Sequence, residues 1–314
     1  MKLRTIRGFL PFLLLAAAMP AFPVTIQYSG DYGTGSGNFT GVPNLSGCSG
    51  ALLADGVHVL TAAHCVANVS VVGGQTVLTP NGISSLFFFT PTFPGGIADA
   101  VTGVQFNPLT TLWFPADPTS ALMMYDLAIV DLATPAPADA FRYNLDLSGF
   151  AIAHNSPVVL AGWGLGGSPG STVNGTGGTR RGGTNNVAGL FDSADDNNLP
   201  GDPVVTLADQ PIALMWNTTS DTSNPANTTG LGNAGDSGGP LTYNGNLIGI
   251  LSFGDLPRSG TVPIGQQFYD GYVNLANPGN ANWLESELGA VPEPGTLLMG
   301  AGAIALLAAK KRRG

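Results

Sequence analysis

The stretch Gly-Asp-Ser-Gly-Gly-Pro at residues 235–240 is the most informative part of the chain for its fold and its chemistry. It holds Ser237 among glycines, which let a backbone approach a bound carbonyl group closely and adopt turn conformations that other residues avoid. Nucleophilic attack by a serine also needs a base, an acid that orients the base, and backbone N–H groups directed at the developing oxyanion. A serine in this setting therefore predicts a histidine and a carboxylate elsewhere in the sequence.

Two other segments offer these groups. Residues 60–65 read Leu-Thr-Ala-Ala-His-Cys and contain His64. Residues 125–132 read Tyr-Asp-Leu-Ala-Ile-Val-Asp-Leu and contain two acids, Asp126 and Asp131. The three segments follow one another in the order histidine, aspartate, serine.

In this order the segments resemble the chymotrypsin-like serine endopeptidases of the trypsin family, and they differ from the orders of subtilisins and α/β-hydrolases. Further matches to the family pattern are Cys-Ser-Gly-Ala-Leu-Leu at 48–53, Ala-Gly-Trp-Gly at 161–164 and Ser-Phe-Gly at 252–254. The resemblance covers roughly residues 45–288. The histidine and serine motifs together, in the right order, are a specific signal.

The resemblance implies a role for each residue. His64 is expected to be the general base, Asp126 the acid that orients it, and Ser237 the nucleophile, with the backbone N–H groups of Gly235 and Ser237 as the oxyanion hole. The family places its acid before an apolar strand, which favours Asp126 over Asp131. The implied activity is hydrolysis of peptide bonds in polypeptide substrates through an acyl-enzyme, with no metal and no organic cofactor.

The primary substrate pocket can also be placed by resemblance. In the family, the residue six positions before the nucleophile lies at the base of this pocket, and here that residue is Leu231. Ser252 and Gly254 are assigned to the same pocket, and Gly254 keeps one wall open to a large side chain. A leucine offers no counter-charge to a buried Arg or Lys, so we expect an apolar residue before the scissile bond. The alternative is that Asp221, the nearest acid upstream, folds back and supplies the charge.

The activation route is expected to differ from that of the pancreatic enzymes. In that family a newly cut Ile-Val-Gly-Gly-type N-terminus inserts and pairs with the aspartate before the nucleophile, here Asp236. Residues 22–47 contain no such sequence. Because an unpaired buried carboxylate is costly, another donor should satisfy Asp236, and removal of an N-terminal leader should suffice for activity.

The body of the chain has the pattern of an all-β protein. Short apolar or β-branched stretches, such as 127–130, 157–162 and 247–252, are separated by Gly, Pro, Asn and Asp. The resemblance implies two antiparallel six-stranded β-barrels, the first over 22–135 and the second over 136–290. A short helix is expected near the end of the second barrel, with its best candidate at residues 282–288.

The N-terminus has the layout of a secretory signal peptide. Three basic residues precede the apolar run at 9–18, and small residues follow through Ala21, which predicts a leader over residues 1–21. In an oxidising compartment the two cysteines, Cys48 and Cys65, form a disulfide by default. Closing a loop of this size contributes about 3 kcal/mol in the loop-entropy picture.

The C-terminus resembles the PEP-CTERM sorting signal of Gram-negative bacteria, which an exosortase recognises and processes. Its parts are Val-Pro-Glu-Pro-Gly at 291–295, an apolar run at 296–309 and four consecutive cations at 310–313. The apolar run is short for a span, yet its basic end would stay on the cytoplasmic side. We therefore expect hydrophobic targeting helices at both ends, transient anchoring, and a secreted or outer-surface protein.

The acidic residues of the chain bear on two questions, whether it binds nucleic acid and whether it binds a metal ion. Between residues 22 and 290 the chain has four basic and nineteen acidic residues, a net charge of −15, which argues against a nucleic-acid partner. Part of this charge lies at 192–202, where Asp192, Asp195, Asp196 and Asp202 offer oxygen ligands for Ca²⁺. Their spacing matches no known calcium loop, so we interpret the segment as a solvated acidic loop.

Two alternative functions remain open on the sequence. One is a catalytically silent, binding member of the same fold, although all three expected catalytic residues are present. The other is a structural protein of the cell surface or matrix, suggested by the sorting tail and the Gly-, Asn- and Thr-rich body. The second alternative leaves the three motifs unexplained.

Overall fold

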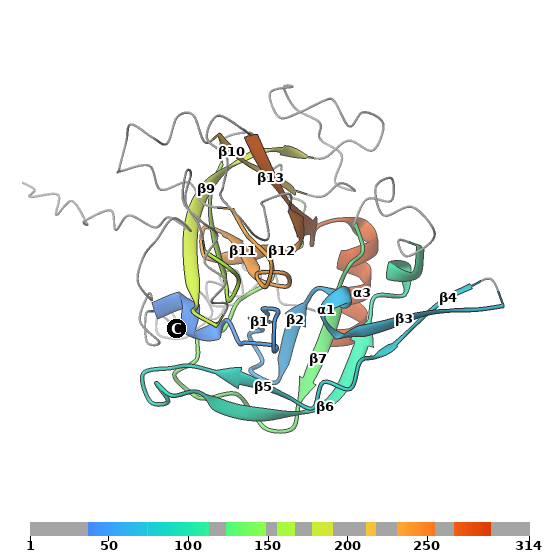
Figure 1. Cartoon of the computed structure of the whole chain (residues 1–314), viewed down its shortest axis with the longest axis horizontal. Helices are drawn as coiled ribbons and strands as arrows, with labels where there is room; N and C mark the ends of the chain where they lie inside the picture. Colours follow the sequence, from blue (N-terminus) through green and yellow to red (C-terminus); the bar gives the residue numbers. More distant parts are fainter. Residues whose placement is uncertain are drawn as a thin grey trace, which may run out of the picture.

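The computed structural model describes eight stretches of the chain: 37–73, 75–112, 124–148, 156–166, 178–190, 212–217, 231–254 and 267–289. These stretches are mostly β-structure, curled into two antiparallel sheets (Figure 1). The predicted signal peptide, sorting segment, hydrophobic targeting helices and acidic loop at 192–202 lie outside the described residues.

The first half forms a curled antiparallel sheet of five strands. Its order is β1 (Ala51–Leu52), β2 (His58–Thr61), β7 (Ala128–Leu132), β6 (Ile97–Phe106) and β5 (Ser85–Phe88). Strands β2 and β7 lie in its middle and are nearly all buried, as expected of apolar, β-branched strands covered on both faces. Two short 3-10 helices accompany this sheet: η1 (Gly37–Gly41) precedes β1, and η2 (Pro108–Leu112) lies between β6 and β7.

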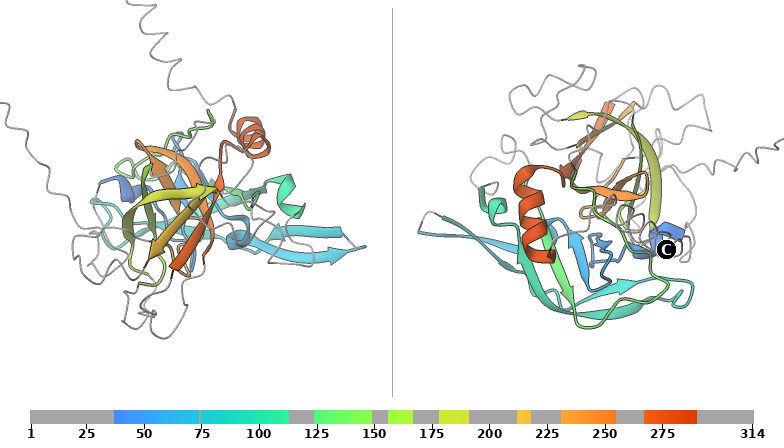
Figure 2. Two further views of the ribbon diagram at one scale, coloured as in Figure 1. Left: turned by 90° about the horizontal axis from the view of Figure 1, so that it is seen from above. Right: turned by 180° about the vertical axis from the view of Figure 1, so that it is seen from behind.

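A separate two-stranded hairpin follows the short helix α1 (Ala63–Val66), which comes after β2. It consists of β3 (Ala67–Val72) and β4 (Gln75–Pro80), paired antiparallel from Ala67–Pro80 to Val72–Gln75. The hairpin projects well away from the body of the molecule (Figure 2). It leaves several valine side chains exposed at Val69, Val72 and Val77.

The second half forms a closed antiparallel barrel. Its order is β10 (Ile212–Asn217), β13 (Gln267–Asn274), β12 (Asn246–Gly254), β11 (Pro240–Tyr243), β8 (Pro157–Gly162) and β9 (Arg181–Leu190). After β13, the helix α3 (Pro278–Leu288) ends the described chain. The side chain of Asn277 accepts hydrogen bonds from the first-turn N–H groups of Gly279 and Asn280, which explains why α3 begins before the predicted 282–288.

Three apolar clusters hold these parts together. One lies in the first sheet and one inside the barrel. The third joins the two halves, because it combines Leu60 and Ile129 with Trp163 and Leu247, and Trp283 of α3 packs into it. Each fully buried side chain of this size contributes about 1.5–3 kcal/mol, so this shared cluster stabilises the packing of the two halves against each other.

The all-β fold with a short C-terminal helix is confirmed, while the expected strand count is not. The described part of the first half holds a five-stranded sheet with the β3–β4 hairpin beside it, in place of the expected six-stranded barrel. The boundary between residues 135 and 136 stays a prediction. Among the residues that the structure describes, no helix is long and apolar enough to span a membrane.

Candidate active site

His64 and Asp126 are brought together by the pairing of β2 with β7. Thr61 of β2 lies opposite Ala128 of β7, so the residues just after β2 and just before β7 meet at one edge of the sheet. His64 lies in the single-turn helix α1 (Ala63–Val66). Its backbone N–H donates to Asp126 Oδ1 at 2.9 Å, and its ring Nδ1 lies 2.7 Å from Asp126 Oδ2.

The Asp126 carboxylate is fully buried and held ionised by its partners. Burial pushes its pKa up, but the charge of His64 and the hydrogen bonds from His64 and Ser252 together hold the pKa below its usual value. The Ser252 hydroxyl donates to Asp126 Oδ2 at 2.6 Å. An ionised acceptor at Nδ1 fixes the ring tautomer with its proton on Nδ1 and leaves Nε2 as the basic atom.

Asp131 lies elsewhere. Its carboxylate accepts hydrogen bonds from the Gln105 side chain at 3.2 Å and lies 3.5 Å from His58 Nε2. The structure thus brings Asp126 to His64, as the sequence favoured, and gives Asp131 a different partner.

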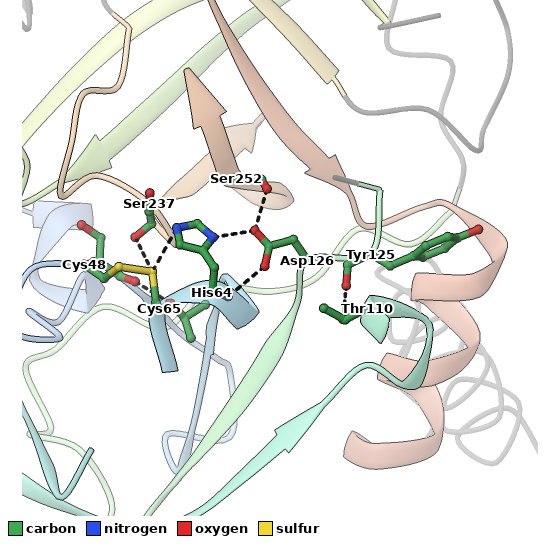
Figure 3. A network of polar contacts seen from close by, with 10 residues as sticks. Cys48, His64, Cys65, Thr110, Tyr125, Asp126, Ser237 and Ser252 are labelled. Atoms are coloured by element: carbon green, nitrogen blue, oxygen red, sulfur yellow. Dashed lines mark hydrogen bonds and ion pairs between the residues drawn. A yellow bond between two sulfur atoms is a disulfide. The ribbon is translucent and has the colours of Figure 1, made fainter. Parts of the chain in front are cut away.

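Ser237 lies beside the His64 ring (Figure 3). Its backbone carbonyl accepts a hydrogen bond from Ser49 N–H at 2.7 Å, which ties the serine loop to the first half of the molecule. In the described part of the chain, the Ser237 hydroxyl makes no hydrogen bond to His64. Such bonds are often formed only when substrate is bound, and rotation about one side-chain bond changes the direction of this hydroxyl.

The predicted disulfide between Cys48 and Cys65 is confirmed. It fastens α1, and with it His64, to the residues before β1. The Cys65 sulfur lies 3.8 Å from His64 Nε2 and 3.5 Å from the Ser237 carbonyl oxygen, so the bridge packs directly under the site (Figure 3). Cys48, His64 and Cys65 are the one described group with metal-ligand spacing, but both sulfurs are committed to the disulfide.

The N–H groups of Gly235 and Ser237 point out of the serine loop. The Ala234 carbonyl accepts from Leu165 N–H at 2.9 Å, and the Asp236 carbonyl accepts from Gly239 N–H at 2.8 Å. A trans peptide directs its N–H opposite to its carbonyl, so these two bonds fix where the following N–H groups point.

Neither of these two N–H groups donates to any group in the described residues. They are therefore available to a ligand. Glycine is needed in this loop, because Gly235 has a φ of +99° and Gly238 a φ of +82°. A Cβ at Gly238 would also overlap the Ser49 carbonyl.

Asp236 has two backbone donors, as the sequence led us to expect. Its Oδ1 accepts from Gly164 N–H at 2.6 Å and its Oδ2 from Asn233 N–H at 2.8 Å. Burial raises the pKa of Asp236 to about 6, although these bonds and the charge of Arg181 act in the opposite direction. A Cβ at Gly162 or Gly164 would overlap the Asp236 side chain, which explains the glycines of the Ala-Gly-Trp-Gly motif.

The three expected pocket residues have different surroundings. Leu231 is only 1% exposed and belongs to the apolar cluster inside the barrel. Ser252 is turned toward Asp126. Gly254, at the end of β12, is exposed.

Sequence reasoning missed two buried residues near the site. Asp270 of β13 accepts a hydrogen bond from Gly232 N–H, and a Cβ at Gly254 would overlap its carboxylate. Ser49 donates through its hydroxyl to the Gly235 carbonyl at 2.9 Å. Asp270 lies in no recognised motif. Ser49 belongs to the Cys-Ser-Gly-Ala-Leu-Leu stretch, but that stretch does not indicate its distant partner Gly235.

Two family models match parts of the chain. Residues 29–187 and 193–274 match the family model described as Trypsin. Residues 290–313 match the PEP-CTERM protein-sorting motif.

Two solved structures are similar to the chain. One is neuropsin, a serine protease expressed in the limbic system of mouse brain, at 17% identity over 77% of this chain and 88% of that one, with a TM-score of 0.47. The other is a mutant of human heparin binding protein (CAP37), at 19% identity over 84% of this chain and 99% of that one, with a TM-score of 0.51. The second likeness supports the fold, and the family model covers most of the chain: the protein belongs to the trypsin family and carries a PEP-CTERM sorting motif.

Proposed function

We propose that the protein is an exported serine endopeptidase in which Ser237, His64 and Asp126 act as the catalytic triad. The observation that carries this proposal is the Asp126 carboxylate, which is fully buried and holds both the backbone N–H and the ring Nδ1 of His64 beside Ser237. A purely structural role would not require a buried, charged carboxylate to form two hydrogen bonds with a partly exposed histidine.

The proposed reaction uses these residues as follows. His64 Nε2 takes the Ser237 hydroxyl proton as Oγ attacks the scissile carbonyl, and the N–H groups of Gly235 and Ser237 receive the oxyanion. Asp126 stabilises the imidazolium, which then protonates the leaving amine. A water molecule, deprotonated by His64, attacks the acyl-enzyme and releases the acid product, and Ser237 regains its proton.

Digestion of a denatured proteome tests this proposal. The wild-type protein should generate new peptide N-termini, and Ser237→Ala should generate none. Equal cleavage by the two proteins would place the activity elsewhere. No cleavage by a folded, correctly exported wild-type protein would favour the silent binding member.

The same digestion tests the primary pocket. We propose that Leu231, Ser252 and Gly254 line it and that it prefers an apolar residue before the scissile bond. Asp270 favours a second candidate, a basic residue, because its buried carboxylate lies directly behind Gly254. Cutting after Leu, Phe, Met or Tyr supports the first candidate. Cutting after Arg and Lys that is lost in Asp270→Asn supports the second.

Binding of a polyanion is not carried over from heparin binding protein. The body between residues 22 and 290 has a net charge of −15, and such a surface repels sulfated or phosphorylated polymers. We propose instead that the partners are polypeptide substrates and, for the tail, an exosortase. The sorting motif implies an exported protein that is sorted or anchored at the cell envelope.

We propose the following organisation for export. Residues 1–21 are removed as a signal peptide, 22–135 and 136–290 form the two halves, and 296–309 anchor the chain transiently before it reaches the outer surface of a Gram-negative cell. N-terminal sequencing and mass determination of the exported protein test both ends, since a start other than Phe22 or an intact tail would contradict this scheme.

A further inference from the structure

Residues 163–166 form hydrogen bonds with the loop that carries the proposed oxyanion hole. Gly164 N–H donates to the Asp236 side chain at 2.6 Å, and Leu165 N–H donates to the Ala234 carbonyl at 2.9 Å. These two neighbouring N–H groups therefore hold the side chain and the backbone of the serine loop at once.

The Arg181 side chain donates hydrogen bonds to the same segment. Its Nη1 donates to the Gly164 carbonyl at 2.6 Å and to the Thr179 carbonyl at 3.3 Å. The guanidinium also lies close to Gly166, since a Cβ at that position would come within 3.1 Å of its central carbon. A charge-assisted donor of this kind makes a strong hydrogen bond.

These contacts form one continuous relay. Arg181 donates to the carbonyl of the Gly164–Leu165 peptide, whose N–H donates to the carbonyl of the Ala234–Gly235 peptide. The N–H of that second peptide is the Gly235 donor. Hydrogen bonds in series polarise one another, so the positive charge of Arg181 both orients the Gly235 N–H and strengthens it as a donor.

Ser49 fixes the opposite side of Gly235. Its hydroxyl donates to the Gly235 carbonyl at 2.9 Å and accepts from Trp163 N–H at 2.9 Å. The Gly235 residue is thus held at both of its peptides by groups that belong to the folded chain itself.

We infer that Arg181 is a positioning residue that holds the Gly235 N–H toward the oxyanion through the Gly164–Leu165 peptide, and so takes the place of an inserted N-terminal amine. The inference rests on the proposed function, because it concerns the oxyanion hole of that site. It also accounts for an arginine in a body that contains no lysine and four arginines in all.

Three variants of the full chain test the role of Arg181. Arg181→Gln should lower kcat about 10- to 100-fold with KM changed less than about threefold, because only transition-state binding uses the Gly235 N–H. Affinity for a peptide aldehyde, which forms a tetrahedral oxyanion on the serine, should fall by the same factor. Arg181→Lys should restore most of the loss, since an ammonium can also donate to the Gly164 carbonyl.

Arg142→Gln is the matched control. Arg142 also donates to backbone carbonyls, at 2.8 Å to Ala140 and 3.2 Å to Ala136. These acceptors do not belong to the serine loop or to residues 163–166, so the loss of Arg142 should leave kcat and aldehyde affinity unchanged. The inference is overturned if Arg181→Gln behaves like this control, if only KM changes, or if a folded Arg181→Lys is as poor as Arg181→Gln. The Lys variant keeps the test valid should the Gln variant fail to fold.

An N-terminal extension tests the second half of the inference. An exported form with a short uncleavable tag before residue 22 should keep kcat/KM within about twofold of the untagged form, because no free amine is needed at Asp236. Activity that appears only after the tag is cut off overturns it. If wild type fails to react with a fluorophosphonate, the proposed function is wrong and this inference falls with it; equal reaction rates for wild type and Arg181→Gln refute the inference alone.

Discussion

Replacement of Asp236 by Asn should change how the stability of the protein depends on pH. In the folded protein, burial raises the pKa of Asp236 from 3.8 to about 6. The folded state therefore prefers the protonated acid, even though Gly164 and Asn233 donate to its oxygens. Asn has no proton to lose, so the variant removes this preference and leaves the other titrating groups in place.

The size and sign of the effect follow from linkage. A shift of about two pKa units corresponds to about 3 kcal/mol. The folded state has the higher pKa, so the contribution of Asp236 to stability is fully present below pH 3.8. It is lost as the pH rises through about 6, where the ionised carboxylate stays buried. Asp126 has the opposite sign, because its pKa is lowered, but it is common to both proteins and cancels in the difference.

Urea unfolding of both proteins from pH 4 to pH 8, with the disulfide intact, measures this difference. The free energy of unfolding of wild type minus that of Asp236→Asn should fall by about 2.5 kcal/mol across this range, since part of the contribution is already lost at pH 4, and level off above pH 7. The side chain of Asn accepts hydrogen bonds through one oxygen only. We therefore expect an additional difference of about 1 kcal/mol between the two free energies of unfolding that does not change with pH. A difference that is flat with pH, or that rises with pH, would refute the reasoning.

The remaining predictions concern catalysis. Asp126→Asn should lower kcat about 10⁴-fold by misorienting the base, and His64→Ala should cost at least as much. Asp131→Asn, whose carboxylate contacts His58 and Gln105 instead, should change kcat less than about threefold; equal damage from both Asn variants would reverse the assignment. kcat/KM should fall as acid protonates His64, and a profile flat through the histidine range would count against a base at this position. Ser252→Ala should cost about tenfold or less in kcat, because Asp126 keeps its two bonds to His64.

The sequence could predict those parts of the candidate site that lie in short, continuous motifs. His64 follows its strand directly, and Asp126 precedes its own, so the pairing of β2 with β7 brings them together without further information. The Ser237 loop is equally local, because its glycines allow the turn that Gly235 and Gly238 adopt. The disulfide followed from the cysteine count and the predicted export.

The support behind this site could not be predicted from the sequence. Ser49 and Gly235 are 186 residues apart, and neither carries a motif that indicates the other. Arg181 begins a strand in a glycine-rich stretch, and nothing in the sequence around it indicates a bond to the Gly164 carbonyl. Asp270 reads as an ordinary strand residue until β13 pairs with β12 and places it behind Gly254.

The described second barrel has six strands, but the expected six strands of the first half are not confirmed, for a related reason. Resemblance to a family implies its average architecture, but the pairing of each strand depends on contacts along its whole edge. β3 and β4 have no charged residue and pair with each other over six positions. They form a separate projecting hairpin, and the first sheet in the described residues is an open sheet of five strands.

Reaction with a fluorophosphonate is the most direct test of the central claim that Ser237 is an activated nucleophile. The exported wild-type protein should take up one label per chain, on a peptide that contains Ser237, and the rate should fall steeply in His64→Ala. Ser237→Ala should take up none. Labelling of Ser237→Ala at the wild-type rate, or a folded and correctly processed wild-type protein that stays unlabelled, would contradict the account.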